Sequence, residues 1–280
     1  MLYSFIHPGS GLGNQLHRYL AGKVLALDKG YEYSAIGKEN FKGKSFMNLD
    51  FGPPNPLRAG IQQPAGKLHI PGLSSEENVT NRGGYVFPKL WEEKTLYYNP
   101  EFNFIEDKTI IDGEFQDERY FEHRLSNIDE WLQVEPIDIP EDVCVIGFRG
   151  GEFYTAPELG LPKSYYDEAI AKMREINPDM KFVIHTDDAE LAHRFFDNKY
   201  VAIHDIGINW RSMRYAKYAI VANSSFYILP RLLKQRVFIK KGDSYELKKD
   251  SVTIAPRYWD RYNIRKWERP YNYYKCFTYL

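Results

Sequence analysis

The chain has 280 residues, a length that suits one large domain or, more naturally, two domains of ordinary size. Its 37 lysines and arginines nearly balance its 38 aspartates and glutamates. No strong overall field would therefore hold the protein on nucleic acid or on an anionic membrane, and any anionic ligand must be bound by local groups.

The ends and the cysteines give an expectation about compartment. The first residues carry no basic region ahead of an apolar stretch, so they do not resemble a secretory signal, and no apolar run is long enough to cross a membrane. Cys144 lies in an apolar run typical of a buried strand, and Cys276 is the only other cysteine. This usage argues against a disulfide framework, and we expect a reducing compartment.

The first half begins with a strand, a glycine loop and a helix. Residues 2–6 (LYSFI) predict the strand. The apolar face predicted for the helix consists of Leu16, Tyr19, Leu20, Val24 and Leu27. Residues 37–103 are rich in Gly, Pro and Asn, which predicts long loops over a small sheet. A strand is predicted again at 109–115 and a helix at 117–132.

The second half alternates short β-branched runs with helical patterns, which predicts a parallel sheet with helices on both faces. The runs are CVIGF, KFVIH, YVAIH, AIVAN and VFIKK. The segment 134–142, with two prolines and four acids, is the best boundary candidate. We therefore predict an α/β fold with two Rossmann-like domains, at 1–138 and 139–255, and an aromatic tail at 256–280 that packs back on the body.

A glycine-rich loop, GSGLGNQ, lies between the first strand and the first helix. In this context backbone N–H groups and a helix N-terminus can meet an anion, and the glycines let the backbone approach a ligand. A dinucleotide fingerprint needs a third glycine where this chain has Asn14, which disfavours a dehydrogenase although Glu32 is at a suitable distance for a ribose contact. A tight turn without a ligand is the alternative.

Three motifs follow predicted strands of the second half, where ligands of such folds bind. Arg149, in GFRGGEF, can bind two phosphate oxygens at once through its guanidinium or form an ion pair with a neighbouring carboxylate. The acids of HTDD suit a ribose or a base, although one of them can cap the next helix, and no separated acid pair predicts a metal. The serine hydroxyls of ANSSF and the N–H groups of the helix that follows could bind a diphosphate. For one of the two serines, helix capping is the alternative.

A fourth motif, QDERYF at residues 116–121, ends the strand at 109–115 and begins a helix. Its acids, Asp117 and Glu118, complement the positive end of a helix dipole, which is the simpler explanation for each acid alone.

In this order, the segments resemble the alpha-1,2-fucosyltransferases of glycosyltransferase family 11. That family begins GGLGNQMFQYA, continues through GYFQSEKYF-like, HxRRGDY and SDD segments, and ends with an ANSSFSWW-like helix start. The counterparts here are GSGLGNQLHRYLA, DGEFQDERYF, GFRGGEF, HTDD and ANSSFYILPRLL. The resemblance spans roughly residues 3 to 235 and leaves out the tail.

The resemblance implies a GT-B architecture, in which two Rossmann-like domains face a cleft. It implies an inverting transfer of fucose from GDP-fucose to a sugar hydroxyl of a glycan acceptor, without a metal or other cofactor. The expected partners are this donor and acceptor, with no nucleic acid and no integral membrane segment. The expected location is the cytoplasm or the periphery of the membrane where glycans are assembled.

The resemblance also implies roles for individual residues. Arg149 and the serines of ANSSF would lie near the diphosphate, and the acids of HTDD near the guanosine. The residues expected to contact the donor or line the cleft are Gly11, Gly13, Asn14, Gln15, Arg149, His185, Asp187, Asp188, Asn223, Ser224, Ser225 and Phe226. For the general base the hypothesis is Asp117 or Glu118, with Glu152 as the alternative.

The arginine motif departs from the family pattern. Gly147 replaces its histidine, Gly150 its second arginine and Glu152 its aspartate. The first two changes remove groups that would lie near the leaving diphosphate. The alternatives are therefore a transferase that uses another nucleotide sugar on the same fold, or a non-catalytic carbohydrate-binding relative.

Overall fold

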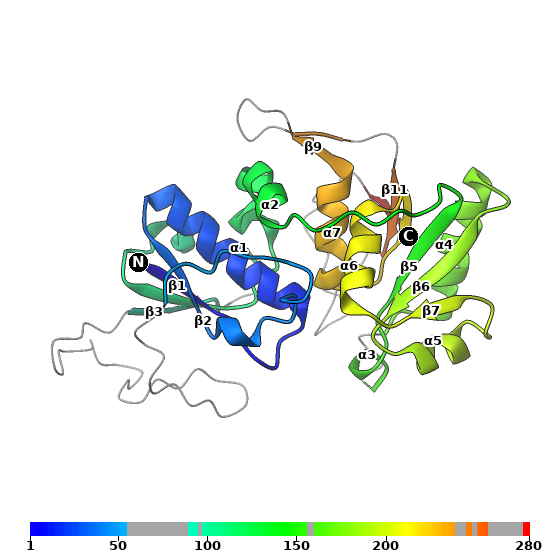
Figure 1. Cartoon of the computed structure of the whole chain (residues 1–280), viewed down its shortest axis with the longest axis horizontal. Coiled ribbons are helices and arrows are strands. Elements are labelled where there is room, and N and C mark those ends of the chain that lie inside the picture. Colours follow the sequence, from blue (N-terminus) through cyan, green and yellow to red (C-terminus); the bar gives the residue numbers. More distant parts are fainter. Residues whose placement is uncertain (55–88, 95–96, 156–159, 239–244, 248–250, 257–276) are drawn as a thin grey trace. The chain divides into compact units, whose positions relative to one another are not determined.

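The computed structural model describes residues 1–54, 89–94, 97–155, 160–238, 245–247, 251–256 and 277–280. The chain divides into two compact units (Figure 1). The N-terminal unit comprises Met1–Lys44 and Leu49–Trp131, and the C-terminal unit comprises Ser45–Asn48 and Leu132–Leu280. The division thus falls just before the segment 134–142 that the sequence marks as a boundary.

The N-terminal unit contains a four-stranded, all-parallel sheet in the order β2-β1-β4-β3. Its strands are β1 (Leu2–Phe5), β2 (Tyr33–Ile36), β3 (Lys89–Glu92) and β4 (Thr109–Asp112). The predicted strands at 2–6 and 109–115 are confirmed as β1 and β4. The region from 37 to 103 also contributes β3, and its residues 55–88 and 95–96 lie outside the described part.

Helix α1 (Leu12–Lys29) connects β1 to β2 and packs on both strands (Figure 1). Leu16 and Leu20 are fully buried on its inner side. The helix comes close to the sheet at Gly22, where a Cβ atom would lie 2.9 Å from the Tyr33 ring and 3.0 Å from the Cβ of Ser4. The glycine is therefore a packing requirement of this helix–sheet contact.

One residue predicted on the buried face of α1 is not there. Leu27 is 46% exposed, because near its C-terminus the helix buries Leu25 and Ala26 instead. The helix ends at Gly30, whose φ of 65° is left-handed and whose N–H caps the last carbonyls.

The helix predicted over 117–132 is divided into three pieces. Two short 3₁₀ helices, η4 (Glu118–Tyr120) and η5 (Glu122–Arg124), precede α2 (Leu125–Trp131). Phe121 separates the two 3₁₀ helices with φ −147° and ψ −6°, and its side chain is fully buried. The burial of this ring fixes a non-helical backbone at a position that local propensity allowed to be helical.

The C-terminal unit contains a six-stranded, all-parallel sheet in the order β12-β11-β8-β5-β6-β7. Its strands are β5 (Val143–Phe148), β6 (Lys181–Thr186), β7 (Val201–Ile203), β8 (Tyr218–Ile220), β11 (Val252–Ala255) and β12 (Thr278–Tyr279). The predicted parallel sheet is therefore confirmed. Through β12, the end of the aromatic tail joins this sheet, while residues 257–276 lie outside the described part.

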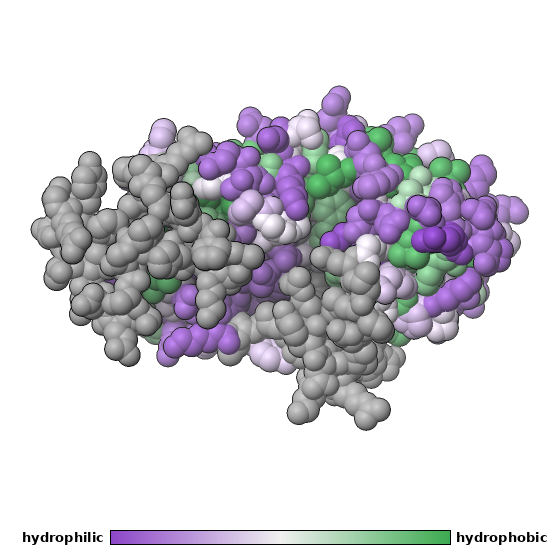
Figure 2. Space-filling view, turned by 90° about the horizontal axis from the view of Figure 1, so that it is seen from below, coloured by the Kyte–Doolittle hydropathy of each residue, from purple (hydrophilic) through white to green (hydrophobic). Residues whose placement is uncertain are grey.

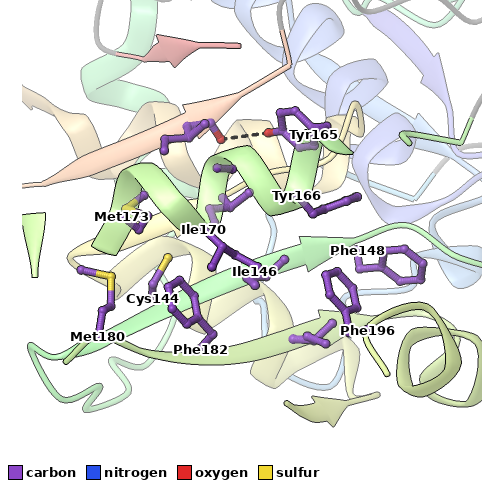
Figure 3. Close-up of a cluster of buried hydrophobic side chains, with 14 of the residues drawn as sticks. Cys144, Ile146, Phe148, Tyr165, Tyr166, Ile170, Met173, Met180, Phe182 and Phe196 are labelled. Carbon is purple, nitrogen blue, oxygen red and sulfur yellow. Dashed lines mark hydrogen bonds between the residues drawn. The ribbon is translucent and has the colours of Figure 1, made fainter. Parts of the chain in front are cut away.

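Helices cover both faces of this sheet, as predicted. The four main ones are α4 (Lys163–Ile176), α5 (Ala189–Phe195), α6 (Ile206–Tyr215) and α7 (Ser225–Gln235). Alternate residues of β5 separate the two layers: Cys144, Ile146 and Phe148 pack with α4 and α5 (Figure 3), whereas Val145 packs with α6 and α7. This alternation follows from the two-residue period of a strand.

The described part of the predicted strand VFIKK, Val237 and Phe238, does not belong to the parallel sheet. β9 (Arg236–Phe238) begins directly after α7 and pairs antiparallel with β10 (Tyr245–Leu247) in a separate ribbon. The place beside β8 is taken by β11, which the sequence analysis did not predict. No residues separate α7 from β9, so the chain has no connection that could bring β9 back alongside β8 as a parallel strand.

The described surface carries few large exposed apolar side chains. They are Leu27, Leu90, Tyr97, Phe104, Ile176, Val201 and Ile206. In the view of Figure 2, hydrophilic residues occupy much of the described surface. Among the described helices, none has both the length and the apolar character needed to cross a bilayer. Scattered apolar side chains are ordinary on protein surfaces, so the search for a site turns to the strand ends.

Candidate functional site

Each parallel sheet has a topological switch point. In the C-terminal sheet the chain passes from β5 outward to β6 and β7, then places β8 on the other side of β5. In the N-terminal sheet it passes from β1 to β2, then forms β3 and β4 on the other side of β1, with β4 next to β1. Ligands of open parallel sheets bind outside the carboxyl ends of the strands at such points. These two sheet edges are therefore the candidate sites.

Arg149 lies directly after β5, at the switch point of the C-terminal sheet. Its Nη1 forms an ion pair with Asp187, which follows β6, and the guanidinium lies 5.1 Å from the centre of the Phe153 ring. The other carboxylate oxygen of Asp187 accepts a hydrogen bond of 2.7 Å from the N–H of Gly150. The side chains of Arg149 and Asp187 are 24% and 32% exposed, so an anion in solution can reach this pair.

Asp188, the second acid of HTDD, caps helix α5. Its carboxylate accepts a 2.9 Å hydrogen bond from the N–H of Leu191, and its own N–H donates to the Thr186 hydroxyl at 3.0 Å. The structure thus gives the two neighbouring acids different environments: Asp187 holds Arg149, and Asp188 begins a helix.

His185 is buried at the end of β6. Its Nδ1 lies 2.7 Å from the Asn209 Oδ1, and the amide nitrogen of Asn209 donates to the Thr186 carbonyl at 3.0 Å. Since this amide nitrogen is directed at a carbonyl, Oδ1 must accept from His185, which places the hydrogen of the neutral ring on Nδ1 and leaves Nε2 an acceptor. Burial lowers the pKa of His185 and favours this neutral form.

Tyr227 occupies the space where the family motif would place a histidine side chain. Its hydroxyl lies 2.8 Å from the His185 carbonyl and 3.2 Å from the Phe148 carbonyl, so it ties the ends of β5 and β6 to α7. A Cβ atom on Gly147 would lie only 2.7 Å from the Tyr227 ring. The glycine at position 147 is therefore required by this ring.

The second departure from the motif has a similar cause. A Cβ atom on Gly150 would lie 2.6 Å from the Cβ of Asp188. A second arginine at this position does not fit beside the capping aspartate. Arg149 is thus the one cation of the motif that this backbone accommodates.

Asn223 and Ser224 lie between β8 and α7, Ser225 is the first residue of α7, and all three are buried. The carbonyl of Ser224 accepts hydrogen bonds from the N–H groups of Tyr227 and Ile228, at 3.0 and 3.1 Å, and so begins the helix. Because β8 is the neighbour of β5, this helix start and Arg149 flank the same switch point.

Phe226, the last residue of ANSSF, lies in the first turn of α7. Its ring makes edge contacts with Trp210, at 5.7 Å, and with Tyr227, at 5.1 Å between ring centres. These contacts account for its aromatic side chain by packing between α6 and α7.

Gln15 of the glycine loop is fully engaged with backbone groups of the N-terminal unit. Its amide nitrogen donates to the carbonyls of His7 and Asn40, both at 3.0 Å, and its oxygen accepts from the N–H of Lys42 at 2.9 Å. The side chain is fully buried. Its amide therefore fastens the loop, which explains a glutamine here without a ligand.

The other residues of the GSGLGNQ motif lie at the start of α1. Gly11 precedes the helix with no side-chain cap, and no atom lies within 4 Å of a Cβ placed there. The carbonyl of Gly13 accepts from His17 at 2.8 Å, and Asn14 accepts from Gln116 at 3.0 Å. The amide pair joins the first turn of α1 to the segment after β4.

The predicted bases lie in different settings. Asp117 caps η4 and accepts two hydrogen bonds from the Arg119 guanidinium, at 2.5 and 2.9 Å, and one from the N–H of Tyr98 at 3.0 Å. Burial alone would raise its pKa, but these hydrogen bonds hold the pKa of Asp117 below its ordinary value. Glu118 is buried in η4, and Glu152 begins the short helix α3 (Glu152–Thr155).

The sequence analysis missed a charged cluster at the N-terminal switch point. His7 follows β1 and its Nε2 lies 2.9 Å from the Asp112 Oδ1 at the end of β4. The buried guanidinium of Arg18 donates to Asp112 at 2.6 Å and to Glu114 at 2.8 Å. Burial raises the pKa of Asp112, but His7 and Arg18 outweigh it and hold the pKa below its ordinary value. The signal was present, since both His7 and Asp112 are polar residues at strand ends.

Glu93, just after β3, is a further missed residue at this edge. One of its oxygens accepts hydrogen bonds of 2.8 Å from the N–H groups of Glu114 and Phe115. A Cβ atom on Gly113 would lie 2.4 Å from the Cβ of Glu93, so that glycine allows the contact. Burial raises the pKa of Glu93 to about 7.

Within the described residues, no three His, Cys, Asp or Glu side chains form a group that could hold a metal ion. The two switch points differ in the groups that they contain. One unit has Arg149 beside a helix start, and the other has a network around His7, Arg18 and Asp112. Comparisons with protein-family models, curated proteins and solved structures found no match to this chain.

Proposed function

We propose that this protein is an inverting glycosyltransferase of the GT-B type, which transfers fucose from GDP-fucose to a sugar hydroxyl of a glycan acceptor. The ordered motifs that resemble glycosyltransferase family 11 suggest this activity. The observation that carries it is the position of Arg149 at the switch point between β5 and β8, beside the start of α7.

The position of Arg149 suits a nucleoside diphosphate. A guanidinium matches two phosphate oxygens, and the free N–H groups of a helix start favour the same negative charge. Asp187 holds the guanidinium at the edge while leaving it partly exposed. An incoming diphosphate can therefore share or replace this carboxylate as the partner of Arg149.

In the proposed reaction, an acceptor hydroxyl attacks the anomeric carbon as the bond from that carbon to the diphosphate breaks, with inversion. Negative charge grows on the departing GDP. Arg149 and the start of α7 stabilise this charge, and such oriented donors commonly supply the largest catalytic contribution. The guanidinium and the helix start carry the role without a metal ion.

A second candidate follows from the two glycines of the arginine motif. Since Tyr227 closes the space at Gly147 and Asp188 the space at Gly150, the site has fewer cations than the family motif provides. This difference favours, as the second candidate, a transferase of the same fold that uses another nucleotide sugar. A non-catalytic carbohydrate-binding relative would retain the fold but not turn over a donor.

Thermal unfolding with GDP, UDP, ADP and TDP, each with and without EDTA, tests the proposal. GDP at a hundred times its dissociation constant should stabilise the protein by about 2.7 kcal/mol, and EDTA should leave the shift unchanged. A shift with UDP alone would exclude GDP-fucose and favour the second candidate. Binding without release of GDP from GDP-fucose in the presence of glycan acceptors would favour the non-catalytic relative.

A further inference from the structure

Asp187 occupies two groups of the C-terminal switch point that are suited to bind an anion. β5 and β6 pair in register up to their last residues, so Arg149 and Asp187 follow two neighbouring strand ends. The Nη1 of Arg149 forms an ion pair with the Oδ2 of Asp187, and the N–H of Gly150 donates to its Oδ1 at 2.7 Å. A cationic donor and a backbone donor therefore already hold one negatively charged group.

The backbone after β5 curves around this carboxylate. Gly151 has a left-handed φ of 49°, and a Cβ atom on it would lie 3.8 Å from the Oδ2 of Asp187, at an ordinary contact distance. Turns that pass through a left-handed residue can direct backbone N–H groups into a concavity that binds anions. Residues 149–151 thus form a turn of this kind, and the anion that it contains is the side chain of Asp187.

A diphosphate requires the same donors. A guanidinium binds two phosphate oxygens at once, and a charge-assisted hydrogen bond from a backbone N–H favours the same ligand. The carboxylate of Asp187 has the same sign of charge as the phosphate and repels it at contact distance. Because the side chains of Arg149 and Asp187 are 24% and 32% exposed, a ligand from solution can displace the carboxylate.

We infer that Asp187 is an internal competitor of the diphosphate, which occupies the turn in the free protein and leaves it when the donor binds. This inference rests on the proposed binding of a nucleotide sugar at Arg149. It gives Asp187 a place beside the diphosphate, whereas the resemblance implies a place beside the guanosine. After transfer, the return of Asp187 to Arg149 promotes the release of GDP.

The size of the effect follows from the population of the occupied turn. A ligand that binds only the molecules in which Asp187 has left is weakened by the fraction of such molecules. Further contacts of Arg149 do not alter this expectation, because the comparison changes only the charge at position 187. Removing that charge should therefore strengthen the binding of any diphosphate at this turn.

Asp205 offers a matched control. It follows β7, the neighbour of β6 in the same sheet, and its carboxylate caps α6 by accepting a 2.7 Å hydrogen bond from the N–H of Ile208. Asparagine caps helices about as well as aspartate. Asp205→Asn therefore removes one negative charge at the end of another strand and keeps the helix cap.

The test compares Asp187→Asn and Asp205→Asn with the wild type by calorimetric titration of the full-length proteins with GDP and with inorganic pyrophosphate. Asparagine at position 187 keeps an acceptor for the N–H of Gly150 but loses the charge that holds Arg149. We expect Asp187→Asn to lower the dissociation constants of both ligands about tenfold, as for a turn that is open in about one wild-type molecule in ten. Asp205→Asn should change both constants much less.

The two ligands distinguish the roles that Asp187 could have. If Asp187 contacts the guanosine, Asp187→Asn will weaken GDP and leave pyrophosphate unchanged. If it only supports the structure of the turn, the substitution will weaken both ligands. Either result overturns the inference, and so do unchanged affinities for both ligands.

A crystal structure of the wild-type protein with pyrophosphate gives a second measurement that does not depend on the folding of a variant. We expect phosphate oxygens on Arg149 and on the N–H of Gly150, with Asp187 moved away from both. Pyrophosphate at Arg149 with Asp187 still in both contacts would overturn the inference. Crystals in which pyrophosphate does not reach Arg149 would overturn it as well.

The outcomes separate the inference from the proposed function. If GDP and pyrophosphate bind neither the wild type nor Asp187→Asn, both fail. If Asp187→Asn binds both ligands more tightly but the wild type releases no GDP from GDP-fucose with any acceptor, the inference stands and the proposed transfer fails. If the wild type turns over GDP-fucose and Asp187→Asn binds GDP no more tightly, the inference alone fails.

Discussion

The two parallel sheets have the same kind of switch point but different chemistry at it. At the C-terminal edge, Arg149 and Asp187 form a partly exposed pair, and the nearby strand ends carry an uncharged network of His185, Asn209 and Tyr227. At the N-terminal edge, the buried guanidinium of Arg18 links two carboxylates, and a histidine joins the same group.

This difference bears on which edge could bind an anion. A partly exposed arginine beside a helix start can exchange its carboxylate for a phosphate group, so it suits an anionic ligand. The guanidinium of Arg18 is buried and committed to two acids, so it fixes the geometry of its neighbours and is not available to a ligand. Of the two edges, the C-terminal one is therefore the better suited to an anionic ligand.

Replacing Arg149 tests the charge-stabilising edge and should have the largest effect. We expect Arg149→Ala to lower kcat on the order of a hundredfold or more, about 3 kcal/mol of transition-state stabilisation, while the fold is retained. Steady-state kinetics with GDP-fucose and circular dichroism check both expectations. Arg194→Ala is the matched control, because this exposed arginine pairs only loosely with Glu190 at 3.3 Å.

A folded Arg149→Ala protein with near-normal turnover would contradict the assignment. In that case the pair with Asp187 would be a structural contact between the ends of β5 and β6. The two edges would then no longer differ in the way proposed.

The pH dependence of stability tests the N-terminal edge through Glu93. Its pKa is raised from 4.5 to about 7 in the folded protein, so the folded state binds this proton more tightly than the unfolded state. The stabilisation is complete below about pH 4.5 and is lost as the pH rises towards 7. Between pH 5 and pH 8 the free energy of unfolding of the Glu93→Gln protein should fall less than that of the wild type, by on the order of 2 kcal/mol. Urea unfolding at the two pH values measures this difference.

Glu92→Gln provides the control, since Glu92 is the adjacent residue on β3 and its side chain is exposed. A Glu93→Gln protein whose stability changes with pH as steeply as the wild type would show that Glu93 is ionised in the folded state without penalty.

The smallest effect is expected at Gly147, beneath the Tyr227 ring. Gly147→Ala places a methyl group 2.7 Å from that ring and should lower the free energy of unfolding by about 1–2 kcal/mol, because the ring must shift in a packed layer. Chemical unfolding measures the change. Gly9→Ala should be close to neutral, since no atom lies within 4 Å of its Cβ position. Equal stability of the Gly147→Ala protein would mean that the ring moves freely.

Part of the candidate site was predictable from strand ends alone. Arg149, Asp187 and Ser224 follow predicted strands of one sheet, so their common edge followed from the alternation of strands and helices. His7 and Asp112 were equally placed by their strands, but no motif drew attention to them. The role of Gln15 was not predictable, because its partners at His7 and Asn40 are brought together only by folding.

The sequence by itself determined the α/β class, the parallel C-terminal sheet and the covering of both its faces. These features depend on hydrophobic periodicity, and periodicity is a local property of the chain. Only the tertiary structure decided which polar strand-end residues meet, that β11 rather than β9 lies beside β8, and that Tyr227 and Asp188 fill the space above Gly147 and Gly150. Such contacts join residues far apart in the chain, and packing rather than local propensity selects among them.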